Sequence, residues 1–163
     1  MAGKKTTIGA SGEAVRANVV RLREAQNLSY AEMTRQLTEI GRPIPELGLR
    51  NIERGQRKVD VDELVALAHV LGVAPVTLLM PNTKDGDELL DIAGFEAITA
   101  RQLWNWLRDG SRPVGAGDPI NLDDVLRSTP RWAMQGGSLE ESEELHKLRT
   151  LISRIQIVNN GND

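Results

Sequence analysis

The 163-residue chain contains no cysteine and only two histidines. Without cysteine it can form no disulfide, no thiolate nucleophile and no cysteine-ligated zinc site. The histidines, His69 and His146, lie far apart in the sequence, so neither a histidine metal cluster nor a Ser-His-Asp arrangement has a local signature. We therefore expect a protein that is not an enzyme and that binds no metal or cofactor.

Long apolar runs are also absent. No segment approaches the roughly 18 consecutive apolar residues that a membrane-spanning helix needs. Lys4 and Lys5 near the start are followed by polar sequence rather than by the apolar stretch of a signal peptide. With 40% apolar residues, the chain still has enough of them for a buried core. These features predict a soluble, cytoplasmic protein.

The net charge of −3 conceals an uneven distribution. Residues 1–60 include 11 basic and 7 acidic residues, a net charge of +4. Residues 61–110 include 3 basic and 8 acidic residues, a net charge of −5, and the remainder has 6 and 8, a net charge of −2. A basic first part followed by an acidic one gives weak support to a phosphate-binding module joined to a second module.

Helical periodicity predicts five short helices in the first half of the chain. Apolar residues recur at helical spacing in each of them, and short loops separate them. The expected ranges are 13–26, 29–40, 46–54, 60–71 and 74–80. Five helices joined in this way predict one compact all-α domain.

Local signals mark the ends of two of these helices. Ser29 with Glu32, and Asp60 with Glu63, have the spacing of capping boxes. Residues 41–45 end the second helix, because glycine tolerates left-handed geometry and proline cannot continue the helical hydrogen bonds. The boundaries of the second and fourth helices are therefore the best defined.

The second half of the chain is expected to be helical as well. Residues 82–88 are polar and read as a linker. Thr99 and Gln102 then have capping-box spacing before a helix with the apolar residues Leu103, Trp104, Trp106 and Leu107. All three tryptophans and the only phenylalanine, Phe95, follow residue 90, which predicts a small separate core.

A last helix is predicted after Ser138. Its apolar residues Leu145, Leu148, Ile152 and Ile155 follow each other at spacings of three and four. This stripe packs either on its own domain or on the same stripe of a second chain, and two heptads do not decide between them. We favour a homodimer formed through these four residues.

Three segments of the first half resemble a known family. They are residues 28–33 (LSYAEM), residues 49–55 (LRNIERG) and residues 61–79. Together they resemble the Cro and phage-repressor-type, or XRE-type, helix-turn-helix, and residues 41–45 and 59–62 are similar to a variant common among actinobacterial regulators of this class. The segment between the second and third helices is longer than in the usual family pattern, which requires a longer second helix or a wider turn.

The resemblance implies a fold and a division of the chain. The fold class is all-α: a five-helix Cro/repressor-like helix-turn-helix domain followed by a smaller helical C-terminal region. The expected parts are a flexible arm (1–12), the DNA-binding domain (13–81), a linker (82–88), a helical dimerisation or partner-binding region (89–158) and a tail (159–163).

The third predicted helix is suited to reading DNA bases. Leu49 and Ile52 are expected to face inward, which leaves the polar side of the helix exposed to a major groove that admits one helix. Arginine pairs with guanine, asparagine with adenine, glutamate accepts from cytosine, and an apolar side chain contacts the thymine methyl. The candidate base contacts are therefore Glu46, Leu47, Arg50 and Asn51.

Other residues near this helix are candidates for the DNA backbone. Contacts to phosphate give affinity and register without sequence information. The candidates are Ser29, Tyr30, Arg42, Arg54, Arg57 and Lys58. The alternative for each charged residue is an ordinary solvated surface position, and Glu53 is expected to pair with an arginine of the first or second helix.

The sequence thus predicts a DNA-binding transcriptional regulator, most simply a dimeric repressor that associates with the nucleoid when bound to DNA. A two-fold dimer places two recognition helices roughly 34 Å apart, which requires an inverted-repeat operator. The alternative is a protein-interaction component, such as an antitoxin or adaptor, whose second half binds a partner and whose DNA binding is autoregulatory.

Overall fold

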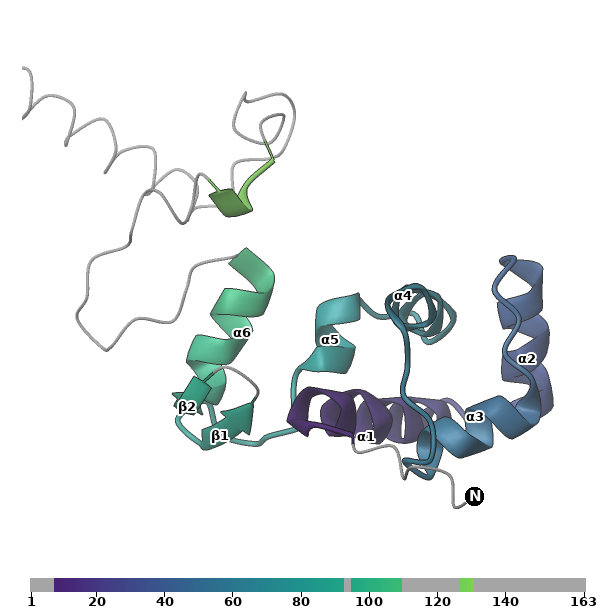
Figure 1. Cartoon of the computed structure of the whole chain (residues 1–163), viewed down its shortest axis with the longest axis horizontal. Coiled ribbons are helices and arrows are strands. Elements are labelled where there is room, and N and C mark those ends of the chain that lie inside the picture. Colours follow the sequence, from purple (N-terminus) through teal and green to yellow (C-terminus); the bar gives the residue numbers. More distant parts are fainter. Residues whose placement is uncertain (1–7, 93–94, 110–126, 131–163) are drawn as a thin grey trace, which may run out of the picture.

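The computed structural model describes residues 8–92, 95–109 and 127–130. Within them the elements are α1 (Ala10–Ala25), α2 (Tyr30–Glu39), α3 (Glu46–Glu53), α4 (Val61–Val70), α5 (Pro75–Leu79), β1 (Leu89–Ile92), β2 (Phe95–Thr99) and α6 (Ala100–Asp109). Figure 1 shows α1 along the base of the helical domain, with α2 and α3 at one end and the β-hairpin and α6 at the other.

The first five helices enclose one hydrophobic core. α1 packs against α3 and α5, and α4 packs against α2 and α5. The most deeply buried large side chains of this core are Val19, Met33, Leu37, Ile44, Leu49, Ile52, Leu67, Leu71 and Leu78. The five-helix arrangement predicted from periodicity is therefore present.

The helix boundaries differ from the predicted ones mainly at α1. This helix begins at Ala10, within the range assigned to the N-terminal arm. Ser11 and Gly12 are weak helix formers, so the sequence pattern becomes persuasive only after them. At the other end, Asn27 has a positive φ of 54°, a conformation that asparagine tolerates better than most residues and that ends the helix.

The two capping predictions have different outcomes. Asp60 and Glu63 form a complete capping box, in which each side chain accepts a hydrogen bond from the other residue's backbone N–H. Ser29 accepts from the backbone N–H of Glu32 at 3.1 Å. The Glu32 carboxylate, however, accepts from Arg35 and Gln36. Ser29 therefore caps α2 without that carboxylate completing the box.

A wide turn rather than a longer α2 absorbs the extra residues before α3. Gly41 has a φ of 78°, and the N–H of Arg42 donates to the carbonyl of Leu37 at 2.9 Å. Ile44 then inserts into the core, where it is 1% exposed, and its carbonyl accepts from the Thr34 hydroxyl at 3.1 Å. Both ends of the turn are therefore anchored, which fixes the start of α3.

A buried asparagine connects α1 to α5. Asn18 is 1% exposed, and its side-chain amide donates to the carbonyls of Thr77, Leu78 and Met80 at 3.2, 3.1 and 2.7 Å. Its carbonyl oxygen accepts from Arg21. These bonds satisfy carbonyl groups that a short helix leaves free at its C-terminal end. The residue holds α5 against α1.

The expectation of an all-α fold is wrong, because β1 and β2 form an antiparallel hairpin between α5 and α6. Leu90 pairs with Ile98 and Ile92 with Phe95, so β2 has one residue more than β1 between these pairs. Ala97, within this interval, has a φ of 61°, as expected of a bulge. The protein therefore combines a helical domain with a small hairpin unit.

The hairpin and α6 share a second, smaller core, as the aromatic residues of this half predicted. It is formed by Leu90, Ile92, Ile98, Ala100 and Leu103, with Met80, Phe95, Trp106 and Leu107 packed against it. The predicted Thr99–Gln102 box at the start of α6 is confirmed by bonds in both directions. The predictions for the last helix and for Trp132 lie outside the described residues.

In the part of the chain that the structure describes, we find no helix with the length and apolar content needed to cross a lipid bilayer.

Candidate nucleic-acid interface

The orientation of α3 is set by its two buried residues. Leu49 and Ile52 are each 1% exposed and belong to the main core, where α3 packs against α1 and α2. Leu47, in contrast, is 66% exposed. Glu46 and Arg50 are exposed and Asn51 is half-buried, so the four candidate base contacts are accessible from solvent.

Gly48 serves the packing of α3. A Cβ at this position would lie 3.1 Å from Cγ2 of Ile44, closer than an ordinary van der Waals contact, and 3.7 Å from Cδ of Pro45. The glycine therefore lets the helix start close to the buried end of the preceding turn. A larger residue would require the Ile44 side chain or α3 to shift by a few tenths of an ångström.

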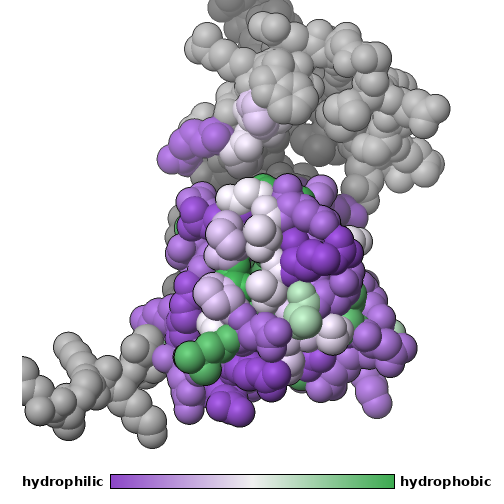
Figure 2. Space-filling view, turned by 90° about the vertical axis from the view of Figure 1, so that its right-hand side faces the viewer, coloured by the Kyte–Doolittle hydropathy of each residue, from purple (hydrophilic) through white to green (hydrophobic). Residues whose placement is uncertain are grey.

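The face around α2 is predominantly hydrophilic. Figure 2 looks onto the side of the molecule where α2 lies in Figure 1, and isolated hydrophobic side chains are scattered among polar ones. A surface of this kind suits a polar partner better than a purely apolar one.

Arg50 has two neighbours in the free protein. Its Nη2 lies 3.5 Å from Oε2 of Glu46, one turn earlier on α3. Its guanidinium carbon lies 4.2 Å from the centre of the Tyr30 ring, which belongs to α2. A cation over an aromatic face at this distance is attracted by the ring quadrupole. Arg50 is thus placed by a residue of the neighbouring helix as well as by its own.

Glu53 connects α1, α2 and α3. Arg23 donates to its carboxylate through Nε at 2.6 Å and Nη2 at 3.1 Å, and Tyr30 donates its hydroxyl proton at 2.5 Å. The side chains of Arg23 and Glu53 are only 13% and 8% exposed. The predicted pairing of Glu53 with an arginine of the first or second helix is confirmed, and the arginine comes from α1.

This network shifts the ionisation of two of its members. The hydrogen bond to Glu53, followed by desolvation, raises the pKa of Tyr30 above its ordinary value. The hydrogen bond to Glu53 likewise raises the pKa of Arg23, against a smaller opposing effect of burial. Both groups therefore keep their protons more firmly in the folded protein. We call the set Arg23, Tyr30 and Glu53 the α1–α3 network.

Four of the six candidate backbone contacts are engaged within the protein. Ser29 caps α2, and the hydroxyl of Tyr30 belongs to the α1–α3 network. Arg42 lies 3.1 Å from Asp60 and 3.3 Å from Asp62. Arg57 pairs with the carboxylate of Glu63, which is 7% exposed. Such pairs must exchange a carboxylate for a phosphate before they can contact DNA.

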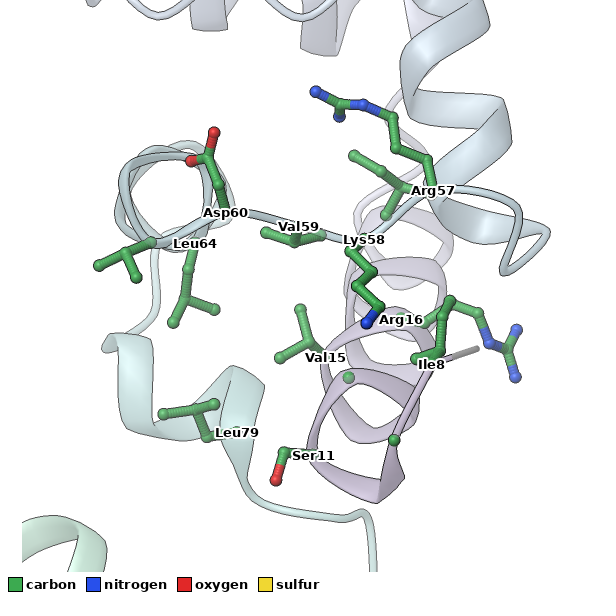
Figure 3. A pocket seen from close by; sticks show the side chains of 14 residues that line it. Ile8, Ser11, Val15, Arg16, Arg57, Lys58, Val59, Asp60, Leu64 and Leu79 are labelled. Carbon is green, nitrogen blue, oxygen red and sulfur yellow. The ribbon is translucent and has the colours of Figure 1, made fainter. Parts of the chain in front are cut away.

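Arg54, the C-cap residue of α3, and Lys58, in the segment before α4, are both exposed. Lys58 lines a cavity of about 270 Å³ between the start of α1, the segment before α4, and α5. Figure 3 shows Lys58 extending along this cavity, whereas Arg57 is directed away from it. The surrounding wall is mainly apolar and includes Val15, Val59 and Leu79.

Two residues of this region could not be assigned from the sequence. The pairing expected for Glu53 left open which arginine of the first or second helix is its partner, and only the fold identifies Arg23. Asn18 gave no signal, because a polar residue on the apolar side of a helix can be partnered only through the fold. In both cases the partner lies on another helix, so the contact is not visible in the local pattern.

The expected dimerisation residues Leu145, Leu148, Ile152 and Ile155 lie outside the described ranges. Within those ranges no three His, Asp or Glu side chains gather in a way that could hold a metal ion.

Comparison of the chain with family models, with curated proteins and with solved structures gives no match to any of them.

Proposed function

We propose that the chain binds double-stranded DNA in a sequence-specific way, by placing α3 in the major groove, and that it acts as a transcriptional repressor of the Cro/phage-repressor type. The observation that supports this most directly is the two-sided burial of α3. Leu49 and Ile52 fix it to the core, while Glu46, Leu47 and Arg50 remain exposed. A helix held in this way can enter a groove without unfolding any part of the domain.

The charge of the domain favours specific over nonspecific binding. Residues 13–81 contain nine basic and nine acidic residues, a net charge of zero. Nonspecific affinity depends almost entirely on neutralising phosphates, so a neutral domain gains little from it. Base contacts by Arg50 and Asn51 must then contribute a large share of the binding free energy.

The same charge balance is the observation that favours a second function. A protein-interaction component such as an antitoxin or adaptor needs no strong phosphate affinity, and its DNA binding would serve autoregulation. In that case the C-terminal half binds a protein partner and the isolated chain binds DNA weakly.

Selection from random-sequence DNA by the purified full-length chain tests the proposal. We expect enrichment of one sequence, arranged as an inverted repeat with half-sites roughly one helical turn, about 34 Å, apart if the chain is a homodimer. An enriched single half-site would indicate a monomer. Failure to enrich any sequence at low salt would contradict specific DNA binding and leave the protein-interaction function.

A further inference from the structure

We propose that Tyr30 is a positioning residue for Arg50: its ring holds the arginine side chain ready for a base, and the hydroxyl serves to fix the ring rather than to bind phosphate. This inference rests on the proposed function, because it assigns Tyr30 a part in base recognition by α3. It replaces the earlier expectation that Tyr30 contacts the DNA backbone.

The first observation is the placement of the ring. The guanidinium carbon of Arg50 lies 4.2 Å from the ring centre, and that of Arg23 lies 4.5 Å from it. Tyr30 is the first residue of α2, whereas Arg50 is in the second turn of α3. The ring therefore spans the gap between the two helices of the helix-turn-helix and contacts the side chain expected to reach a base.

The second observation is that the ring cannot turn freely. Its hydroxyl donates to Glu53 at 2.5 Å, and Glu53 is itself held by two hydrogen bonds from Arg23. Arg23 also donates to the carbonyl of Leu28 at 3.1 Å, within the turn that leads to α2. The α1–α3 network thus fixes the ring by its distal atom, while the start of α2 fixes it by its backbone.

The consequence concerns the entropy of binding. Arginine has many rotamers, and an unrestrained Arg50 would lose them on forming a bidentate contact with guanine. A side chain that already lies against a fixed aromatic ring loses fewer rotamers on binding. Glu46, its other neighbour, is 3.5 Å away and exposed, so it restrains Arg50 less.

The hydroxyl proton is already used within the protein. A phosphate oxygen would have to compete with the Glu53 carboxylate for it, next to that negative charge. Tyr30→Phe should therefore keep the ring beneath Arg50, held only by the backbone of α2, and lose part of the DNA affinity, whereas Tyr30→Leu should remove the support and lose more. A phosphate-binding tyrosine would lose affinity equally in both variants.

The contact can be tested without DNA, in the full-length wild-type protein. Protons of the Arg50 side chain that lie over an aromatic ring are shielded, so their NMR resonances should be shifted upfield. Tyr30 is the only tyrosine of the chain, and the shift should persist in Tyr30→Phe and in Glu46→Gln but vanish in Tyr30→Leu. Unshifted Arg50 resonances in the wild-type protein would overturn the proposal, whether or not any variant folds.

The role in recognition is tested with a double-mutant cycle on the selected DNA site. Arg50→Ala should weaken binding about tenfold or more, and Tyr30→Leu should cause most of the same loss. The double variant should bind no more weakly than Arg50→Ala alone, because the ring acts through the arginine. Arg35→Gln, on the exposed side of α2 and outside the candidate contacts, serves as the control for loss of one positive charge.

Three results would overturn the proposal. Additive losses of DNA affinity in the cycle would show that Tyr30 acts independently of Arg50, while the proposed DNA-binding function would stand. Equal losses for Tyr30→Phe and Tyr30→Leu would assign the hydroxyl to the DNA. Shielded Arg50 resonances without any enriched DNA sequence would leave the contact in place and overturn both the proposed function and the part of Tyr30 in it.

Discussion

At the scale of single residues, the domain near α3 is organised around a charge that is almost completely buried. Glu53 is 8% exposed, and its carboxylate is satisfied by Arg23 and Tyr30. A buried charge that loses its partner is far more costly than an exposed one. The α1–α3 network should therefore matter for stability as well as for the placement of α3.

Replacing Glu53 tests this stability role. Glu53→Ala leaves the guanidinium of Arg23 without its main partner, and we expect the free energy of unfolding to fall by about 3 kcal/mol. Urea denaturation followed by circular dichroism measures it. The matched control is Arg35→Ala, which breaks fully exposed ion pairs on α2 and should change stability little. Equal losses in the free energy of unfolding for Glu53→Ala and Arg35→Ala would contradict the stabilising role of the α1–α3 network.

The raised pKa of Tyr30 predicts how stability changes at alkaline pH. The folded protein holds this proton more firmly than the unfolded chain, whose tyrosine titrates near about pH 10. The resulting stabilisation is fully present below the unfolded value and is lost as pH rises through the folded value. As pH rises above about 10, the wild-type protein should lose more stability than Tyr30→Phe, in which this proton is absent. Equal changes in the free energy of unfolding with pH for the two proteins would refute the hydrogen bond between Tyr30 and Glu53.

Lys58 and Arg57 are neighbours in sequence but should respond differently to salt. Lys58→Gln should lower the slope of log K against log salt by about 1 if its amine contacts phosphate. Arg57 is paired with the buried Glu63, so Arg57→Gln should chiefly destabilise the fold. Binding titrations between low and moderate salt measure the first effect and thermal unfolding the second. An unchanged slope in Lys58→Gln would remove it from the interface.

At the scale of the elements, the segment between α2 and α3 has the clearest structural role. Ile44 is 1% exposed and anchors the end of a wide turn, whereas Ile40 at its beginning is 42% exposed. The predicted range of 29–40 extends one residue too far, because α2 ends at Glu39 and Ile40 is its C-cap residue.

These two isoleucines form a matched pair for mutagenesis. Ile44→Ala should destabilise the domain by about 3 kcal/mol, since it leaves a cavity beneath the start of α3. Ile40→Ala should cost about 1 kcal/mol or less, because 42% of this residue stays in contact with water in the folded state. Chemical denaturation of both variants measures the difference. Similar losses would contradict the anchoring role of the turn.

How much of the elements could be predicted depended on their length. Four of the five helices of the first domain have eight residues or more, enough for apolar periodicity and end signals to be read, and the five-residue α5 is bounded by Pro75 and Pro81. β1 and β2 have four and five residues, too few for alternation to stand out in a segment expected to be helical. Phe95, read as a core residue, indicated the second core correctly but not its strands.

The candidate site was predictable as a set of exposed residues but not as an arrangement. The polar side of α3 follows from local spacing. The engagement of Tyr30 by Glu53 does not, because 23 positions separate them and only the packing of α2 against α3 brings them together. The ion pair of Arg42 with Asp60, 18 positions away, was missed for the same reason. Arg57 and Glu63 are only six positions apart, but their pairing depends on the path of the segment before α4.

At the scale of the whole molecule, the described part joins a neutral helical domain to a small hairpin unit through Met80, which packs on the second core. The neutrality of residues 13–81 means that affinity for DNA cannot come from bulk charge alone. Under the proposed function, recognition then depends on the few side chains of α3 that face solvent.

The most direct test of this account is the ratio of affinities for the selected DNA site and for a scrambled duplex, measured for the wild-type protein and for Arg50→Ala at one salt concentration. We expect the substitution to lower the ratio by about tenfold or more, with scrambled DNA bound almost as before. A loss that is equal on both duplexes, or no loss on either, would contradict base reading by α3.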